Sequence, residues 1–165
     1  MDKEVIHISV RYLVEFILRS GDLDNRRGGF ADKEAMAKGS RLHRKIQKRM
    51  GAEYRAEVAL SHQVEFDEFV IEVEGRADGI IEAENKVTID EIKGVYRDVT
   101  KMQKPAVLHL AQAKCYAYIY AEQKQVPVYD RETDILYTAF DAIGLEGFEI
   151  HFDEEGICLT RDGDT

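Results

Sequence analysis

Two neighbouring stretches decide the fold: Gly75-Arg76-Ala77-Asp78-Gly79-Ile80 and Ile89-Asp90-Glu91-Ile92-Lys93-Gly94. Each lies in a region where apolar residues recur with a period of two, which is typical of half-buried strands. Side chains alternate between the two faces of a strand, so Glu91 and Lys93 share one face and Ile92 points to the other. If the two strands pair as a hairpin, Asp78 approaches Glu91. The sequence therefore predicts two carboxylates and an ammonium group on one face of a sheet.

The rest of the chain indicates a layered domain around these strands. Alternation from about Glu57 to Lys93 predicts an antiparallel meander of three or four strands, with turns at Asp67-Glu68 and over 83–86. Residues 22–30 are typical of a loop because they contain two adjacent glycines. Helices are predicted over 10–19 after the cap residue Ser9, over 33–50 after Asp32, and over 106–121 after Pro105; strands are predicted near 135–140, 148–152 and 157–160. This order is typical of an α/β or α+β domain with a mixed central sheet flanked by helices.

Length and composition define the broad class. The chain has 165 residues, of which 44% are hydrophobic and 33% charged, and we expect a single domain over 1–165. No apolar run reaches the roughly 18 residues of a membrane span, and the first residues lack the pattern of a signal peptide. Two cysteines are too few for a disulfide scaffold or a four-cysteine metal site. We therefore expect a cytoplasmic protein without a membrane segment.

Charge is unevenly distributed along the chain. The formal net charge is −9, which by itself argues against nonspecific binding to nucleic acid. Residues 1–50 nevertheless carry 12 Lys and Arg against 7 Asp and Glu, whereas residues 126–165 carry 2 against 11. A basic first third permits a basic surface that contacts nucleic acid.

Asp78, Glu91 and Lys93 have the chemistry of a site for a hard divalent cation. Mg²⁺ prefers oxygen ligands and usually retains waters and a phosphate oxygen. A bound metal lowers the pKa of a water ligand, and Lys93 would orient that water or neutralise developing charge. The alternative is an exposed strand with cross-strand Glu–Lys pairs and Asp78 in a turn, because such triplets are common.

Two predicted helices carry further polar candidates. His43 follows Gly39 by one helical turn, and the alternative for it is a partly buried side chain without a ligand. His109, Gln112 and Tyr116 lie on one side of an otherwise apolar helix, at spacings of three and four. The alternative for these three is a hydrogen-bond network between elements, because buried polar side chains require partners.

Together these features form an ordered series. The motifs are Gly39-x-x-x-His43, Gly75-x-x-Asp78, Glu91-x-Lys93 and Gln112-x-x-x-Tyr116. The series resembles the PD-(D/E)XK nuclease superfamily, within it the RecB-like exonuclease group, and more weakly the nuclease module found ahead of some bacterial helicases. The resemblance covers about residues 39 to 120. Ala77 stands where the superfamily name has proline, which the RecB-like group tolerates.

The resemblance implies a restriction-endonuclease-like core and a metal-dependent deoxyribonuclease. It assigns His43, Asp78, Glu91 and the backbone carbonyl of Ile92 as ligands of Mg²⁺ or Mn²⁺, and Asp78, Glu91 and Lys93 as the catalytic residues. Gln112 and Tyr116 would organise or contact the nucleic acid. Further phosphate contacts are expected from four basic residues of the same predicted helix as His43: Arg41, Arg44, Lys45 and Lys48.

The expected function is hydrolysis of phosphodiester bonds in DNA, as an exonuclease in DNA repair or processing. The alternative is a noncatalytic nucleic-acid or protein-binding module on the same fold. Some RecB-like relatives hold a four-cysteine iron–sulfur cluster, which we do not expect here because the chain has two cysteines. The sequence has no G-x-x-x-x-G-K-[ST] motif, so an expected helicase partner would be a separate chain or another part of a longer one.

Overall fold

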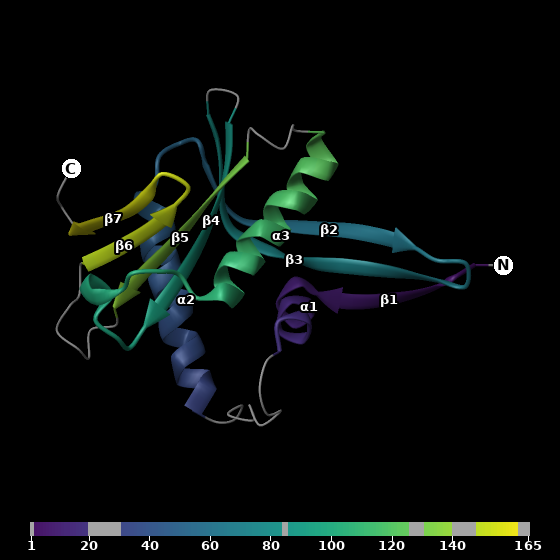
Figure 1. The fold of residues 1–165 in the computed structure, drawn as a ribbon, viewed down its shortest axis with the longest axis horizontal. Helices are drawn as coiled ribbons and strands as arrows, with labels where there is room; N and C mark the ends of the chain where they lie inside the picture. The colour runs from purple at the N-terminus through teal and green to yellow at the C-terminus, as the bar shows by residue number, and fades with distance from the viewer. Residues whose placement is uncertain (1, 20–30, 84–85, 126–130, 140–147, 162–165) are drawn as a thin grey trace.

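A computed structural model describes residues 2–19, 31–83, 86–125, 131–139 and 148–161 (Figure 1). Its elements are β1 (Glu4–Ser9), α1 (Val10–Ile17), α2 (Ala31–Arg49), β2 (Tyr54–Glu65), β3 (Phe69–Ala83), β4 (Lys86–Val95), the short 3₁₀ helix η1 (Val99–Lys101), α3 (Val107–Lys124), β5 (Arg131–Ala139), β6 (Phe148–Asp153) and β7 (Gly156–Arg161). The described strands form one seven-stranded mixed sheet in the order β1-β3-β4-β5-β6-β7, with β2 paired to β3. The protein is therefore a mixed α/β domain. No helix of the described residues is long and apolar enough to cross a membrane.

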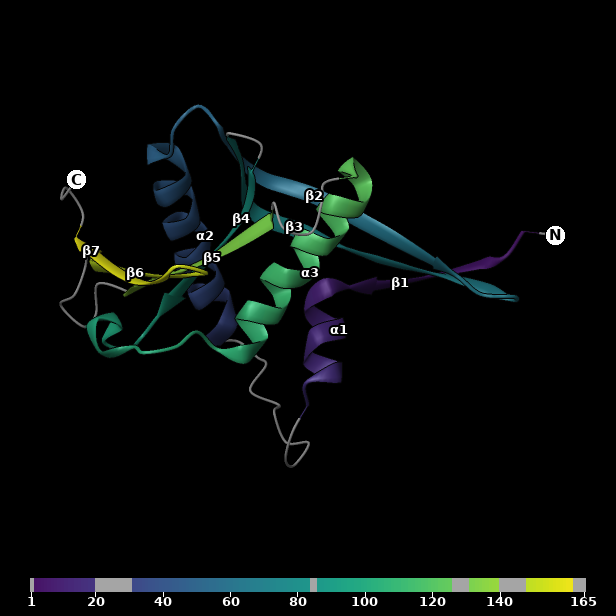
Figure 2. The same ribbon diagram turned by 45° about the horizontal axis from the view of Figure 1, so that its top comes forward.

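Helices α2 and α3 cover opposite faces of the sheet (Figures 1 and 2). The two helices find apolar partners on both faces because side chains along β4 alternate between them. Ile89 packs in a core cluster with Tyr116 and Tyr120 of α3, whereas Ile92 packs with Ile46 of α2. Since these two β4 residues lie on opposite faces, β4 is buried from both sides and forms the centre of the domain.

The longest strand, β3, has two different neighbours along one edge. Its first part, Phe69–Glu74, pairs in parallel with β1, and its last part, Gly79–Ala83, pairs antiparallel with β4. Because β2 pairs with β3 along its other edge, residues 75–78 lie between these two partners without a strand on the first edge. This interruption is the fork where β3 and β4 separate.

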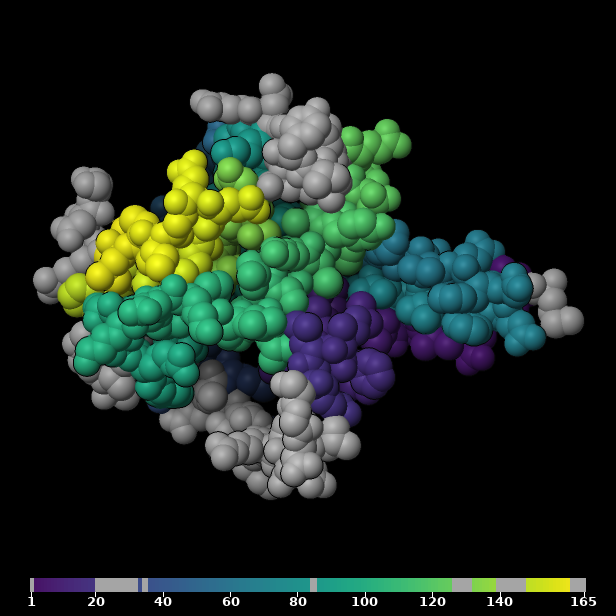
Figure 3. All heavy atoms as spheres, in the orientation of Figure 1, coloured from purple at the N-terminus to yellow at the C-terminus, as the bar shows by residue number. Residues whose placement is uncertain are grey.

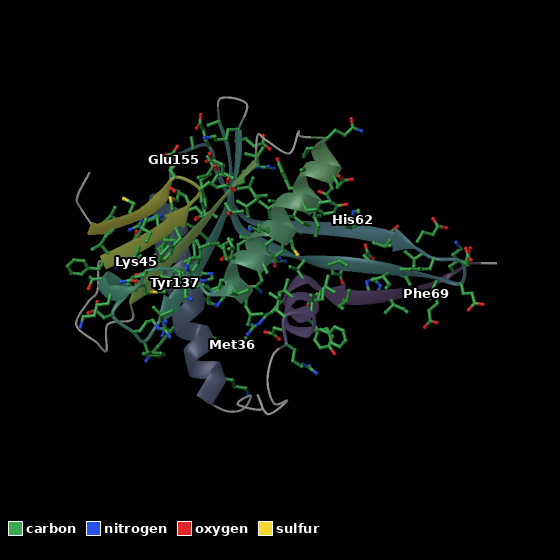
Figure 4. All side chains as sticks on the ribbon, viewed as in Figure 1. Met36, Lys45, His62, Phe69, Tyr137 and Glu155 are labelled. Atoms are coloured by element: carbon green, nitrogen blue, oxygen red, sulfur yellow. The ribbon has the colours of Figure 1, made fainter. Side chains whose placement is uncertain are left out.

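The strand β1, the end of β2 and the beginning of β3 project from the helices as an arm (Figures 1 and 3). Phe69 lies near the end of this arm (Figure 4), where its ring stacks on that of Phe66 with centroids 4.8 Å apart. The strand β1 was not predicted. Its residues Val5-Ile6-His7-Ile8 do not alternate, and most of them are exposed, so the period-two signal of a half-buried strand is missing.

Of the other sequence predictions, two are confirmed, one has a different boundary, and one lies outside the described residues. Ser9 caps α1 by accepting a hydrogen bond from the Tyr12 backbone N–H at 3.0 Å, and the meander has the three strands β2, β3 and β4. Helix α2 begins at Ala31, so Asp32 lies inside its first turn and not before it as predicted. The predicted loop over 22–30 lies outside the described residues.

Candidate functional site

Asp78 lies in the fork, where the two strands of the predicted hairpin separate. The last antiparallel pair is Gly79 with Asp90, so the next position on each strand places Asp78 across from Glu91. The Oδ2 atom of Asp78 accepts a hydrogen bond from the backbone N–H of Ile92 at 2.7 Å. This N–H has lost its strand partner because β3 and β4 separate here, and the carboxylate replaces the missing acceptor. The backbone of Ile92 thereby forms part of the fork, whereas its side chain lies in the core beneath α2.

Glu91 is almost completely buried beside Lys93. The two side chains form an ion pair at 2.8 Å between Lys93 Nζ and Glu91 Oε1, and Glu91 is only 4% exposed. Burial, followed by the negative charge of Asp78, raises the pKa of Glu91 to about 7, although Lys93 lowers it. The second oxygen, Oε2, is buried and has no hydrogen-bond partner in the described part of the chain. A buried oxygen without a partner is costly, and a cation would satisfy it.

His43 reaches Asp78 from α2. Its Nδ1 lies 3.4 Å from Asp78 Oδ1, so the two oxygens of Asp78 face different partners. Burial lowers the pKa of His43, but the hydrogen bond and charge of Asp78 outweigh this effect and raise it above the usual value. The predicted approach of these two residues is therefore present, with one imidazole nitrogen next to one carboxylate.

Glu57 joins this group, although no sequence motif marks it. One ligand atom each from His43, Glu57 and Asp78 lies within 4.8 Å of the other two. Glu57 lies across from Asp78 on β2, between the pairs Ala56–Gly79 and Val58–Ala77, and its φ of 54° is uncommon for a non-glycine residue. Sequence patterns carry no signal for this conformation, because the surrounding strands impose it.

Gln47 fixes Glu57 against Asp78. Its Nε2 donates to Glu57 Oε1 at 3.0 Å and to the backbone oxygen of Asp78 at 2.9 Å. Since Gln47 follows His43 by one turn of α2, the same helix positions both the imidazole and the amide at the fork.

Helix α3 supplies Tyr116 and Gln112 from the other face. Tyr116 is 6% exposed, and its hydroxyl packs against Gly75, where an added Cβ would lie 2.8 Å from the phenolic oxygen. Burial, together with the charges of Glu91 and Asp78, raises the pKa of Tyr116. Gln112 is also 6% exposed and precedes Tyr116 by one helical turn. His109 belongs elsewhere: its Nδ1 lies 2.7 Å from the hydroxyl of Tyr137.

The predicted basic residues lie on the outside of α2. Arg41, Arg44, Lys45 and Lys48 are all exposed on the helix that carries His43. Asp90, which directly precedes Glu91 on β4, is 1% exposed and accepts a hydrogen bond from Tyr54 at 2.8 Å. It lies next to Asp134 of β5, and its side chain is on the face of β4 opposite to Glu91 and Lys93.

The donor set fits a hard divalent cation. Carboxylate oxygens with one imidazole nitrogen suit Mg²⁺ or Mn²⁺, and the partnerless Oε2 of Glu91 is a preformed acceptor. One group of ligand-type side chains in the described residues contains His43, Glu57 and Asp78, whereas the sequence motifs predict His43 and Asp78 together with Glu91. Glu91 lies beside this group with one oxygen paired to Lys93.

No protein-family model and no curated protein matches the chain. Solved structures do match it, among them one titled "Crystal structure of SSO0001". That structure aligns with 99% of this chain and 71% of its own, with a TM-score of 0.56 and 18% sequence identity. At this identity the likeness concerns the fold alone.

Proposed function

We propose that this protein is a metal-dependent DNA nuclease with a PD-(D/E)XK core of the RecB-like type. The observation that carries the proposal is the fork between β3 and β4, where Asp78, His43 and the ion-paired Glu91 and Lys93 come together. Three of these groups are metal-ligand types, and the fourth is a cation beside them. This combination matches the chemistry of phosphodiester hydrolysis better than that of an ordinary buried ion pair.

Each group at the fork has a distinct role in this proposal. His43, Asp78 and Glu91, with Glu57 and the backbone of Ile92 beside them, would hold Mg²⁺ or Mn²⁺. A bound cation of this kind supplies a water of lowered pKa and a positive charge next to a phosphoryl oxygen. Lys93, whose side chain is 26% exposed, remains accessible enough to donate a hydrogen bond to the attacking water.

Groups around the fork would hold the DNA. Tyr116 and Gln112 approach from α3, and Tyr116 is close enough for Asp78 and Glu91 to influence its pKa. The exposed residues Arg41, Arg44 and Lys48 of α2 would contact phosphates on either side of the reacting bond. A helicase partner, as a separate chain or as part of a longer one, would supply single strands to an exonuclease of this kind.

The test is cleavage of end-labelled single- and double-stranded DNA by the purified chain. We expect products with Mn²⁺ or Mg²⁺, none with excess EDTA, and none from Glu91→Gln. Glu122→Gln is the matched control, because Glu122 is an exposed carboxylate on α3. Cleavage that persists in EDTA or in Glu91→Gln would contradict the proposal. DNA binding without metal-dependent cleavage would instead support the alternative of a noncatalytic binding module.

A further inference from the structure

A cavity of about 700 Å³ lies where β4 leads into α3. It is lined by the end of β4, by η1, by the connection to α3 and by the first turn of α3. Its volume lies within the range of roughly 300–1,000 Å³ that is typical of small-ligand pockets. None of the residues in the four sequence motifs lines it.

The walls of the cavity are positively charged in a protein that is strongly acidic. Arg97, Lys101 and Lys104 line it, against a single carboxylate, Asp98. Asp98 accepts hydrogen bonds from the backbone and hydroxyl of Thr100 through Oδ1, and its Oδ2 lies 3.7 Å from Nζ of the largely exposed Lys101. The lining therefore carries a formal charge of +2, whereas the whole chain carries −9. An anion is the ligand that this charge favours.

The floor of the cavity presents fixed polar groups. Tyr137 is 1% exposed and lies between β5 and α3 (Figure 4), where its hydroxyl accepts a hydrogen bond from the Ala106 backbone N–H at 2.8 Å. The Nδ1 atom of His109 lies 2.7 Å from the same hydroxyl, so one of these two groups donates a hydrogen bond to the other. Burial, followed by the charges of Lys93 and Arg11, lowers the pKa of His109 to about 4, so the ring is a neutral donor.

The cavity adjoins the candidate site at its Lys93 end. Val95, two residues after Lys93 on β4, lines the cavity, and Lys93 is close enough to His109 to affect its pKa. His109 in turn precedes Gln112 by three residues on α3. A strand of nucleic acid with one phosphate at the fork would therefore have a neighbouring nucleotide within reach of this cavity.

We infer that this cavity binds the phosphate of a nucleotide next to the reacting bond, with Arg97, Lys101 and Lys104 as its anion contacts. This inference rests on the proposed function for the identity of the ligand. It implies that the strand leaves the fork past η1 and the beginning of α3. The basic cavity would thus set the direction in which DNA crosses the site.

The experiment compares two matched double variants in EDTA, where metal binding plays no part. Lys101→Ala/Lys104→Ala removes two exposed lysines from the cavity, and Lys114→Ala/Lys124→Ala removes two exposed lysines from elsewhere on α3. We measure the anisotropy of a fluorescein-labelled oligothymidylate over a series of salt concentrations. The cavity variant should bind about tenfold more weakly, and its slope of log K against log salt should fall by about 1.4, the value for two lost phosphate contacts on a single strand. The control variant should bind like the wild type.

A second measurement locates the nucleotide itself. Thymidine monophosphate added to the ¹⁵N-labelled chain should shift the amide signals of Ala106 and His109, and the cavity variant should lose these shifts. Equal oligonucleotide affinity and salt slope in the two double variants, or no nucleotide binding by the wild type, would overturn the inference even if the protein cleaves DNA. Binding in the cavity without metal-dependent cleavage would support the cavity and refute the nuclease.

Discussion

The carboxylate of Asp78 accepts a hydrogen bond from the Ile92 backbone N–H at 2.7 Å, at the point where their strands separate. One oxygen of Asp78 thus completes the backbone pairing of the fork, and the other lies 3.4 Å from His43. The same side chain therefore supports the local structure and offers a ligand atom. These two roles are separable by substitution.

Two substitutions of Asp78 should have different effects on stability. Asp78→Asn keeps an oxygen that accepts from Ile92, so the free energy of unfolding should change little. Asp78→Ala leaves the N–H of the buried residue Ile92 without this partner and should cost roughly 1–3 kcal/mol. Both should lower cleavage about 100-fold or more, because each removes the charge of a proposed metal ligand. Urea unfolding and cleavage assays on both variants check this, and equal stabilities would show that the hydrogen bond to Ile92 is unimportant.

Substitutions of Glu91 and Lys93 should distinguish a role in metal binding from a role in catalysis. Glu91→Ala should weaken Mn²⁺ binding and abolish cleavage. Lys93→Ala should also abolish cleavage, but its metal affinity should stay the same or increase, because the ammonium now 2.8 Å from Glu91 Oε1 repels the cation. Calorimetric titration of Mn²⁺ into both variants gives the affinities. Near-normal cleavage by Lys93→Ala would refute the catalytic role of the lysine, whatever the metal affinity.

The hairpin at the centre of the site was predictable because its register follows from local signals. Alternation in β3 and β4 and the turn between them fix Gly79 opposite Asp90, and this pairing alone brings Asp78 to Glu91. The apolar helix over 107–124 and the Ser9 cap likewise depend on residues close in sequence. For these features, the conformation that neighbouring residues favour is also the one that the whole fold requires.

Features that depend on distant segments were not predictable. Strand β1 pairs with a segment more than 60 residues away and is mostly exposed, so its own sequence has no clear period. Glu57 belongs to the site because the β2–β3 register places it across from Asp78, in a left-handed conformation that a glutamate does not favour, and because Gln47 of α2 binds its carboxylate. The cavity beside α3 depends on how η1 folds against Tyr137, and no motif marks it.

Replacing Glu57 with glycine should raise stability and lower metal affinity. Glycine adopts a φ of 54° without the steric cost of a Cβ, so Glu57→Gly should raise the free energy of unfolding by roughly 0.5–1 kcal/mol. Loss of the carboxylate should weaken Mn²⁺ binding about tenfold, as expected for a group that supports a metal site. This result would mean that the protein tolerates backbone strain at Glu57 because the carboxylate is needed at the metal site.

The conservative variant makes the test of Glu57 specific. Glu57→Gln retains an oxygen for the hydrogen bond from Gln47 but removes the charge, so it should lose metal affinity without gaining stability. Glu53→Gln, in the exposed segment before β2, serves as the control. If Glu57→Gln binds Mn²⁺ as tightly as the wild type, Glu57 plays no part in metal binding.

A second charged network, on β5 and β6, should make stability depend on pH. His151 Nδ1 lies 2.8 Å from Asp134 Oδ2, and its Nε2 lies 3.7 Å from Glu149 Oε2. The other carboxylate oxygen of Glu149, Oε1, pairs with Arg49. Burial lowers the pKa of His151, but Asp134 and Glu149 overcome this effect and raise it to about 10. Charged His151 therefore stabilises the folded state fully below its unfolded pKa of about 6.5, and this contribution disappears as the pH rises through about 10.

The variant His151→Gln should remove this dependence. The difference in unfolding free energy between wild type and variant should be on the order of 2 kcal/mol near pH 6, after allowance for partial exposure of the side chain, and should approach zero near pH 10. Urea unfolding at intervals across this range measures it, with His62→Gln of β2 as the control for loss of an imidazole. Asp134→Asn should flatten the profile in the same way, because it removes the carboxylate that holds the proton on His151. A difference between wild type and His151→Gln that stays constant across this range would mean that the network does not hold His151 in its charged form.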